Sequence, residues 1–410
     1  MEQVKTLFLQ AIKAALQGKA ADWDEDVSPD QYAYMLDLAQ NHHLLPMFFE
    51  ATYRCPAAAA IEPARSAACR RAVLQSVSMQ SVQTQSFLDM RRHLQEQGIQ
   101  PLVVKGIVCR NLYPLPDHRY SGDEDLLCPP GQVDACHQAL GTYGMKPCTD
   151  NLDAYEVAYR KDDGTLYIEL HKTLFAAESD IFGECNQLFE GAFDRAAEIT
   201  VDGQAILTLC PTDHLLYLIH HAFKHFLHSG FGIRQVCDMA LFANAYGKDV
   251  DWGYLQEKCA KLRADRFAAT LFAIGEKYLN FDPGMACYPE SWQAVSADEA
   301  PLLEDLLRGG IYGAATPDRL HSSNMTLTAA SAGKKGKRST GVLGAAFPSA
   351  KALQNRFPYL KRKPYLLPVA WISRFAGYAK ENAAGNGTAQ NAVKTGAERI
   401  ELLRKYNIID

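Results

Sequence analysis

Residues 101–128 constrain the fold more than any other stretch of the chain. They begin with a short apolar run at 102–104, which predicts a buried strand. Residues 107–113 then carry apolar side chains at helical spacing, and two prolines end that helix in a loop. The loop leads through the acidic triplet 123–125 into a second apolar run. We therefore expect a strand, a short helix, a loop and a second strand, within a domain of the α+β class.

The acidic triplet predicts a metal site. Side chains alternate in an extended segment, so Asp123 and Asp125 point to one side and Glu124 to the other. Two carboxylates that project together from a buried strand repel each other, and a hard divalent cation is the usual reason to tolerate this. Further along, Glu169 lies in the apolar run 166–171, which follows a predicted hairpin turn. It is either a third carboxylate of the site or a surface residue of an edge strand. His171, two residues on, shares its face.

Four motifs together resemble the nucleotidyltransferase superfamily of the DNA polymerase β type. They are Lys105-Gly106, the R-x-S-G-D-x-D pattern over 119–125, the h-E-h pattern around Glu169, and the later Lys224-His225 pair. Two branches are most similar: an uncharacterised bacterial family with a K-H helix, and a toxin-like branch with K-G-G. The resemblance implies a polymerase-β-like core, a small mixed sheet with flanking helices.

The resemblance also implies what the acids do. Asp123 and Asp125 would bind two Mg²⁺ (or Mn²⁺) ions, and Glu169 would bind the ion on the nucleophile side. The expected reaction moves a nucleoside monophosphate from a nucleoside triphosphate to an acceptor hydroxyl and releases pyrophosphate. The acceptor, whether a small molecule, RNA or a protein, is not specified by the sequence.

Further residues are expected to contact the triphosphate. Lys105 would place a charge beside the phosphates, and Gly106 would let a phosphate approach the first turn of a helix. This chain has Ile107 where the superfamily usually has Gly or Ser, which puts the phosphate geometry in doubt. Arg119 and Ser121 are expected to meet phosphate as well, although Arg119 is equally suited to brace the carboxylates.

A polar arc follows in the histidine-rich helix 213–230. Lys224 and His225 lie on it at helical spacing with two further histidines. The arc is a nucleotide-facing patch, a solvated surface or, with His221 and His225, a zinc site. The related families carry an Arg and an Asp after the K-H pair, and these fall on Arg234 and Asp238. Arg234 is therefore expected beside the nucleotide, or in a buried ion pair with Asp238.

Composition and charge bound the remaining possibilities. The chain has 410 residues, of which 48% are hydrophobic and 22% charged, as in a soluble globular protein. No apolar run is long enough to span a membrane. The eleven cysteines lack zinc-type spacing, which favours free thiols and a cytoplasmic location. We expect four parts: a helical region at 1–97, the catalytic domain at 98–210, a helical substrate domain at 211–310, and a basic segment at 311–410.

The basic segment suggests an anionic partner. Residues 319–380 carry twelve Lys or Arg and no Asp or Glu, whereas the whole chain has a net charge of −5. Aromatic residues are interleaved with the charges over 356–375, a pattern that suits RNA or an anionic lipid surface. Within this segment, 329–341 is expected to be mobile. The alternative to an enzyme is a catalytically silent protein that keeps the fold and senses nucleotides or binds RNA.

Overall fold

The computed structural model describes residues 2–23, 26–310, 319, 323, 325–327, 329–331, 350–353, 357–373 and 389–410. The chain divides into two compact units. The first unit comprises Met1–Ile219, Arg234–Leu255 and Leu271–Ala294, and the second comprises His220–Ile233, Gln256–Thr270 and Val295–Asp410. These units are not the four parts expected from the sequence, whose boundaries stay a prediction.

A seven-stranded mixed sheet forms the centre of the first unit. Its order is β3-β4-β5-β2-β1-β7-β6. The strands are β1 (Leu102–Val104), β2 (Glu124–Leu127), β3 (Met145–Pro147), β4 (Glu156–Lys161), β5 (Tyr167–His171), β6 (Ala197–Val201) and β7 (Gln204–Thr208). The pairs β1–β7 and β2–β5 are parallel, and the others are antiparallel. With the many helices around this sheet, the expected α+β class is confirmed.

The sequence explains which strands lie in the middle. Every residue of β1 and β2 is buried. This is expected for β1, a short apolar run, whereas β2 also buries Glu124 and Asp125 ahead of its two leucines. The outer hairpin β6–β7 turns at Asp202 and Gly203, both with positive φ, which is the backbone of a tight two-residue turn. The strands predicted at 102–104 and around Glu169 are β1 and β5, and they lie on either side of β2 in the sheet.

Five helices precede the sheet: α1 (Glu2–Leu16), α2 (Pro29–Asn41), α3 (Leu45–Thr52), α4 (Pro56–Ala60) and α5 (Pro63–Glu96). Ser28 caps α2 with a capping box, as its sequence predicts. Over 29–52 the chain forms two helices, α2 and α3, rather than one continuous helix. His42 ends α2, and His43 takes a φ of +53°, which a continuing helix does not allow.

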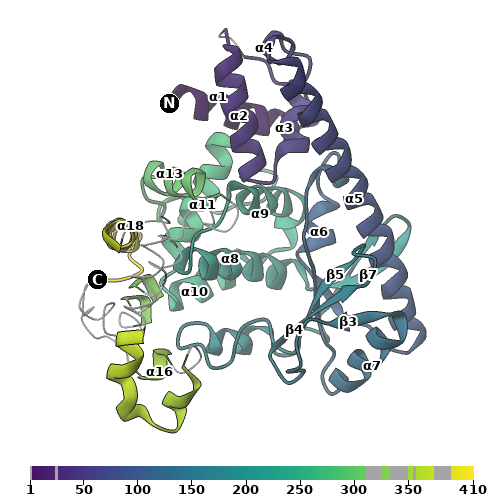
Figure 1. The fold of residues 1–410 in the computed structure, drawn as a ribbon, viewed down its shortest axis with the longest axis vertical. Helices are drawn as coiled ribbons and strands as arrows, with labels where there is room; N and C mark the ends of the chain where they lie inside the picture. The colour runs from purple at the N-terminus through teal and green to yellow at the C-terminus, as the bar shows by residue number, and fades with distance from the viewer. Residues whose placement is uncertain are drawn as a thin grey trace. The chain divides into compact units, whose positions relative to one another are not determined.

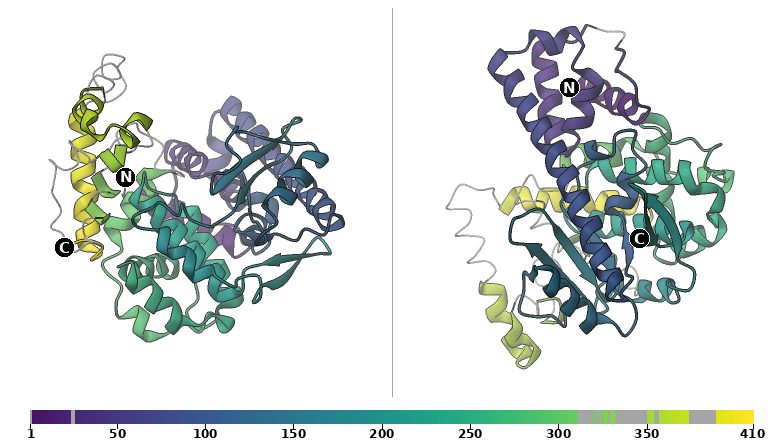
Figure 2. Two further views of the ribbon diagram at one scale, coloured as in Figure 1. Left: turned by 90° about the horizontal axis from the view of Figure 1, so that it is seen from below. Right: turned by 90° about the vertical axis from the view of Figure 1, so that its right-hand side faces the viewer.

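Helix α5 packs along the sheet and forms a spine of the first unit. It runs from the N-terminal helices to the region of α7 (Val133–Tyr143) (Figure 1). The Gln80 side-chain oxygen accepts a hydrogen bond of 2.7 Å from the backbone N–H of Ser121, and the Tyr143 hydroxyl donates to the Ser86 carbonyl. The right-hand view of Figure 2 shows α5 crossing the face of the strands. The spine thus holds the loop that precedes the acidic triplet.

The remaining elements around the sheet are mostly short. They are α6 (Gly106–Arg110), η1 (Pro116–His118), η2 (Gly183–Phe189), α9 (Ile233–Tyr246), η3 (Gly247–Asp249) and α12 (Glu290–Gln293). Helices α8 (Pro211–Leu227), α10 (Trp252–Lys261) and α11 (Asp265–Tyr278) each have residues in both units. Of these elements, η2 is a 3₁₀ segment rather than an α-helix.

The second unit has its own aromatic core. Phe267 makes ring contacts with Phe223 and Phe226 at centroid distances of 5.4 and 4.8 Å. Its other described elements are α13 (Ala300–Gly309), α16 (Ala350–Leu353), η4 (Pro358–Lys361), η5 (Pro364–Leu366) and α18 (Ala389–Lys405). Of the segment 329–341, residues 329–331 are helical and the rest lies outside the described residues. Across the described part of the chain, no helix is both long enough and apolar enough to cross a membrane.

Candidate functional site

Two acidic side chains meet across adjacent parallel strands. In the β2–β5 ladder, Asp125 pairs in register with Glu169. Side chains at paired positions of neighbouring strands lie on the same face of a sheet, so the two carboxylates are brought together. Asp125 is fully buried and Glu169 is partly exposed. The tertiary structure thus unites two acids that are 44 residues apart in the chain.

His171 joins this pair. Its Nε2 lies 3.0 Å from Asp125 Oδ1 and 3.8 Å from Glu169 Oε2. The potential ligand atoms of Asp125, Glu169 and His171 all lie within 4.8 Å of one another. Among the described residues, no other three His, Cys, Asp or Glu side chains come together closely enough to hold a metal ion. A fourth side chain, Glu156 on β4, lies 3.6 Å from Nδ1 of the same imidazole. The sequence left the role of His171 open and did not single out Glu156.

Asp123 stands just before β2, outside that group. It is partly exposed, and its carbonyl oxygen accepts a hydrogen bond of 3.0 Å from the Ser121 hydroxyl. Its charge still reaches the cluster. Burial raises the pKa of Glu169 to about 8, and the carboxylates of Asp125, Glu156 and Asp123 add to this effect. The cluster therefore holds more acid than its surroundings neutralise.

Lys105 is the cation nearest to these acids. Its Nζ lies 2.9 Å from Asp125 Oδ2, and the side chain is largely buried. Burial by itself would lower the pKa of Lys105, but the Asp125 carboxylate outweighs it, and the pKa stands well above its usual value. Correspondingly, burial would raise the pKa of Asp125, but Lys105 and His171 hold it well below the usual range. Lys105 thus stays charged beside an ionised Asp125.

The backbone of Lys105 is strained. Its φ of +53° and ψ of −124° occupy a region that residues with a side chain rarely adopt, between β1 and α6. Such strain costs about 1–3 kcal/mol and persists only where the surroundings impose it. The Lys105 N–H donates to Nε2 of the buried His214, whose Nδ1 lies 3.0 Å from the Thr208 hydroxyl. Since Nε2 accepts, this imidazole is neutral with its proton on Nδ1. The sequence analysis did not identify His214.

Acid should weaken this support. Burial lowers the pKa of His214 to about 3, with Asp238 opposing the change and Lys105 adding to it. The unfolded chain therefore takes up the proton at a higher pH than the folded chain does. The stability that neutral His214 contributes should be complete above about pH 6.5 and fall by roughly 1.4 kcal/mol per pH unit as the pH drops toward 3.

Urea unfolding of the wild type and of His214→Gln at a series of pH values from neutral to acid measures this effect. Other buried histidines, such as His220, also take up protons on unfolding, so the informative quantity is the difference between the two proteins. Glutamine retains an acceptor for Lys105 but does not titrate, so its pH dependence should be shallower. Equal pH dependence in both proteins would show that His214 does not contribute.

Gly106 is required by the packing of Glu124 beneath it. Glu124 is completely buried; one of its oxygens accepts from the Ile107 N–H at 2.6 Å and the other from Arg110 at 2.8 Å. The sequence placed Glu124 on the face opposite Asp125 without a role, and the structure makes it the partner of α6. The Ile107 N–H, one of the first-turn groups expected to meet a phosphate, already has this intramolecular acceptor.

Replacing Gly106 by Ala should therefore destabilise the protein by roughly 1–3 kcal/mol. A Cβ atom at this position would stand 1.9 Å from Glu124 Oε2, and Arg110 holds that carboxylate in place. The control is Gly98→Ala, where φ is also positive at +75° but no atom lies within 4 Å of the added Cβ. The difference in the free energy of unfolding between the two variants isolates the clash from backbone strain. Equal losses would contradict it.

Arg119 is part of a buried ion pair. Its Nε and Nη2 donate to the two carboxylate oxygens of Asp238 at 3.0 and 2.6 Å, and Tyr113 donates to the same carboxylate at 2.7 Å. The remaining guanidinium nitrogen, Nη1, donates to the Ser121 hydroxyl at 2.9 Å. Burial would raise the pKa of Asp238, but Arg119 outweighs it and lowers the pKa. Arg119 thus braces the loop before β2 through Asp238 and Ser121, and the predicted phosphate role of both residues is not tested by these contacts.

Arg234 also supports that loop, since its Nη1 donates to the carbonyl oxygen of Tyr120. The Tyr120 ring in turn makes an edge contact with His43 at 4.7 Å. Arg234 helps to lower the pKa of Asp238, whose direct ionic partner is Arg119. The expected Arg234–Asp238 interaction thus acts alongside a closer one with Arg119.

Lys224 and His225 belong to the second unit, whereas the acidic cluster belongs to the first. Both side chains are partly exposed on α8, and the Nε2 atoms of His221 and His225 lie 3.2 Å apart. That spacing agrees with the predicted polar arc. A zinc site would need a third ligand beside these two histidines. Within the described residues, the one group of three potential ligands is that of Asp125, Glu169 and His171.

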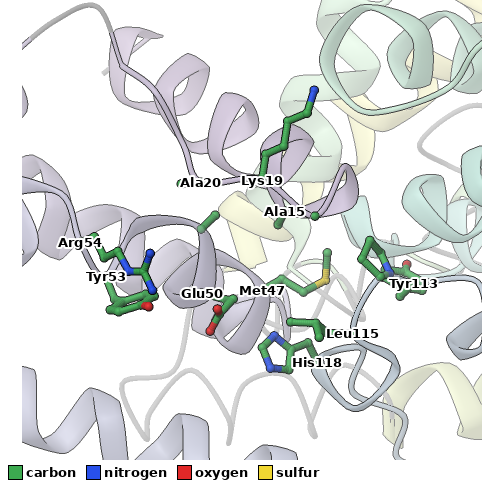
Figure 3. Close-up of a pocket in the computed structure, with 13 residues that line it drawn as sticks. Ala15, Lys19, Ala20, Met47, Glu50, Tyr53, Arg54, Tyr113, Leu115 and His118 are labelled. Carbon is green, nitrogen blue, oxygen red and sulfur yellow. The ribbon is translucent and has the colours of Figure 1, made fainter.

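A separate cavity of about 410 Å³ lies beside the loop between Tyr113 and His118 (Figure 3). Its other walls come from the end of α1 and from α3, with Met47 and Glu50 facing it. None of the predicted site residues lines it. Tyr113 connects the two regions, because it borders this cavity and donates to Asp238. The cavity is thus enclosed by the N-terminal helices and the loop that leads to Arg119, and both polar and apolar side chains line it.

Comparison with known proteins identifies a family. A family model described as "Uncharacterised nucleotidyltransferase" matches residues 28–280, more than half of the chain. One solved structure is similar: an antigenic nucleotidyltransferase-like protein from Paracoccidioides brasiliensis, at 15% identity and a TM-score of 0.31, over 50% of this chain and 95% of that one. The search of curated proteins found no match. The matched range contains the sheet, the acidic cluster and α8.

Proposed function

Because this chain belongs to the uncharacterised nucleotidyltransferase family, we propose that it moves a nucleoside monophosphate from a nucleoside triphosphate to an acceptor hydroxyl, with release of pyrophosphate. A polymerase-β-like core is part of the proposal. The observation that carries it is the group formed by Asp125, Glu169 and His171 on adjacent strands. An acid cluster of this kind, on a fold whose family is nucleotidyltransferase, supports transfer more than structural use.

The residues of this group fit a hard divalent cation, Mg²⁺ or Mn²⁺. They offer two carboxylates and an imidazole within 4.8 Å. Burial and the neighbouring acids together raise the pKa of Glu169, and a bound cation would offset both effects. Asp125 and Glu169 would hold it, with Asp123 completing the set from the preceding loop. When bound, the cation would activate the attacking hydroxyl and neutralise charge on the phosphates.

The chain's own residues would position the reactants. Lys105 keeps its proton beside Asp125, so it can place a positive charge on a phosphate that enters the site. Glu169, whose pKa is raised to about 8, would accept the proton of the acceptor hydroxyl once a bound cation has displaced its own proton. His171 contacts Asp125, Glu169 and Glu156, which orients the carboxylates.

The remaining predicted site residues are supported less directly than the acids and Lys105. Gly106 seats Glu124 at the start of α6, and contact of its backbone with a phosphate would be additional. Arg119 and Ser121 brace the loop that carries Asp123, and phosphate contact from either would be additional. Arg234 fixes the same loop through Tyr120. For Lys224 and His225, the support is the K-H pattern of the family branch and their exposure on α8.

A turnover assay with the full chain tests the proposal. Each of the four nucleoside triphosphates, labelled at the α-phosphate, is incubated with protein, Mg²⁺ and cell extract, and RNA, protein and small molecules are then separated. Label in one fraction, dependent on both the protein and the cation, identifies the acceptor class. Nucleotide binding without transfer to any fraction would favour the alternative, a silent nucleotide sensor. The intact acid group argues against that alternative, since a silent protein has no need to retain it.

A further inference from the structure

Residues 357–373 form a small folded group in the second unit with α16 (Figure 1). Leu353, Leu360 and Ala370 are its buried centre. Five partly buried side chains pack against that centre: Phe357, Tyr359, Leu366, Leu367 and Trp371. The group therefore already has an apolar core of its own, and that core uses only one side of the helical stretch 367–373.

The other side of that helix is apolar as well. Residues 364–373, which read PYLLPVAWIS, contain no charged side chain. Val369 and Ile372 are three residues apart in the helical stretch 367–373, so they lie on one face of it, and Tyr365 precedes them in η5. Tyr365, Val369 and Ile372 are 72%, 49% and 68% exposed, among the most exposed large hydrophobic residues that the structure describes. A helix that is apolar on all sides is normally covered on all sides, so this face is built to be covered.

Positive charge adjoins the exposed face. Lys361, Arg362 and Lys363 directly precede the apolar stretch, and all three are exposed. Among the residues that the structure describes, none of them forms an ion pair. No acidic residue occurs anywhere from 319 to 380. Whatever covers the apolar face therefore meets a cationic border, and its own surface must be anionic.

We propose that residues 357–373 dock on an anionic lipid surface. The apolar face would enter the region between headgroups and acyl chains, and the three cations would contact the anionic headgroups. RNA fits less well, because Val369 and Ile372 offer it neither stacking nor hydrogen bonds. Of the four aromatic residues at 357–373, only Tyr365 is exposed, whereas Phe357, Tyr359 and Trp371 pack against the core. A second copy of the same face would bring two cationic clusters together. This inference is independent of the proposed catalytic function.

Vesicle co-sedimentation with the full chain tests the docking. The protein should bind vesicles of phosphatidylcholine mixed with phosphatidylglycerol, fail to bind phosphatidylcholine alone, and be released as salt is raised. Replacing Lys361, Arg362 and Lys363 with Gln should weaken binding about a hundredfold, because each cation near such a surface contributes a factor of about five. The control removes three exposed cations of the first unit, Arg70, Arg71 and Lys248, and should bind as the wild type does.

The apolar face is tested separately. Val369→Ser with Ile372→Ser should weaken vesicle binding by about tenfold or more, because the buried aliphatic area is lost. Its control is Leu74→Ser with Met79→Ser, which removes exposed apolar side chains from α5. All these positions are exposed, so the melting temperature should not change. Absence of binding to anionic vesicles, equal loss in the controls, or binding to RNA but not to vesicles would each overturn the proposal.

Discussion

Replacing Asp125 with Asn is expected to reduce cation-dependent nucleotide turnover by at least about 10²–10³-fold, the loss typical of removing one charge-stabilising group from a preorganised site. Asp125 is the one acid of the cluster that contacts Lys105, His171 and, through the strand register, Glu169. Asparagine keeps the size of the side chain but removes the charge that a cation requires. Turnover is measured with α-labelled nucleoside triphosphates, and Mn²⁺ binding by electron paramagnetic resonance gives a second readout.

The matched control is Asp162→Asn, an exposed acid in the β4–β5 hairpin whose partner, Lys146, is equally exposed. It should keep full turnover and full Mn²⁺ binding. Full turnover in Asp125→Asn would remove this residue from the site. Loss of turnover with unchanged Mn²⁺ binding would leave the residue essential but would contradict its role as a ligand.

The structure changes the stability expected of this variant. Repulsion between Asp123 and Asp125 suggests that neutralising either one relieves strain in the protein without metal. Because Asp125 is ion-paired with the buried Lys105, its replacement instead leaves that ammonium without its carboxylate, and such a loss is destabilising. Asp123 is partly exposed and lies outside that pair, so Asp123→Asn should be the milder change.

Removal of Arg119 is expected to cause the largest loss of stability. In Arg119→Met the Asp238 carboxylate stays buried and keeps the hydrogen bond from Tyr113, but it loses its ionic partner. Breaking a buried ion pair in this way costs about 3–5 kcal/mol. Adding Asp238→Asn should recover part of the loss, because no uncompensated charge then remains buried. The free energy of unfolding of the two single variants and the double variant measures the coupling.

Arg65→Met is the control for this cycle. Arg65 pairs with Asp37 at 2.7 Å, only 0.1 Å longer than the buried contact, but the two side chains are 40% and 67% exposed. Exposed pairs contribute about 0–1 kcal/mol. A loss in Arg119→Met no larger than in Arg65→Met would show that the buried network does not hold the loop.

Strand pairing could be predicted only in part from the sequence. The short strands at 102–104 and around Asp125 and Glu169 follow from apolar runs bounded by turn residues, because those patterns are local. That β5 pairs with β2 in parallel, with Asp125 opposite Glu169, depends on the crossover of the chain between them. The sequence suggested the neighbours but did not specify the register.

The roles of several polar residues were beyond sequence reasoning for a physical reason. Glu124, Arg110, His214 and Glu156 act through partners that are distant in the chain or on the far side of a strand, and spacing carries no signal for such contacts. Arg119 belonged to a recognisable motif, yet its partner Asp238 lies 119 residues away. Only burial makes that pair necessary, since a buried guanidinium requires a carboxylate.

The sequence by itself therefore determined the α+β class and the positions of the main strands, and it singled out the acids of the predicted site, because hydrophobic periodicity and short motifs are properties of neighbouring residues. The tertiary structure alone decided which acids meet, and it added His171 and Lys105 to them. It also decided that Gly106 is needed to seat Glu124. These outcomes depend on contacts between residues that only the folded chain brings together. Because these side chains are buried from water, the contacts contribute more to stability than the same contacts would at the surface.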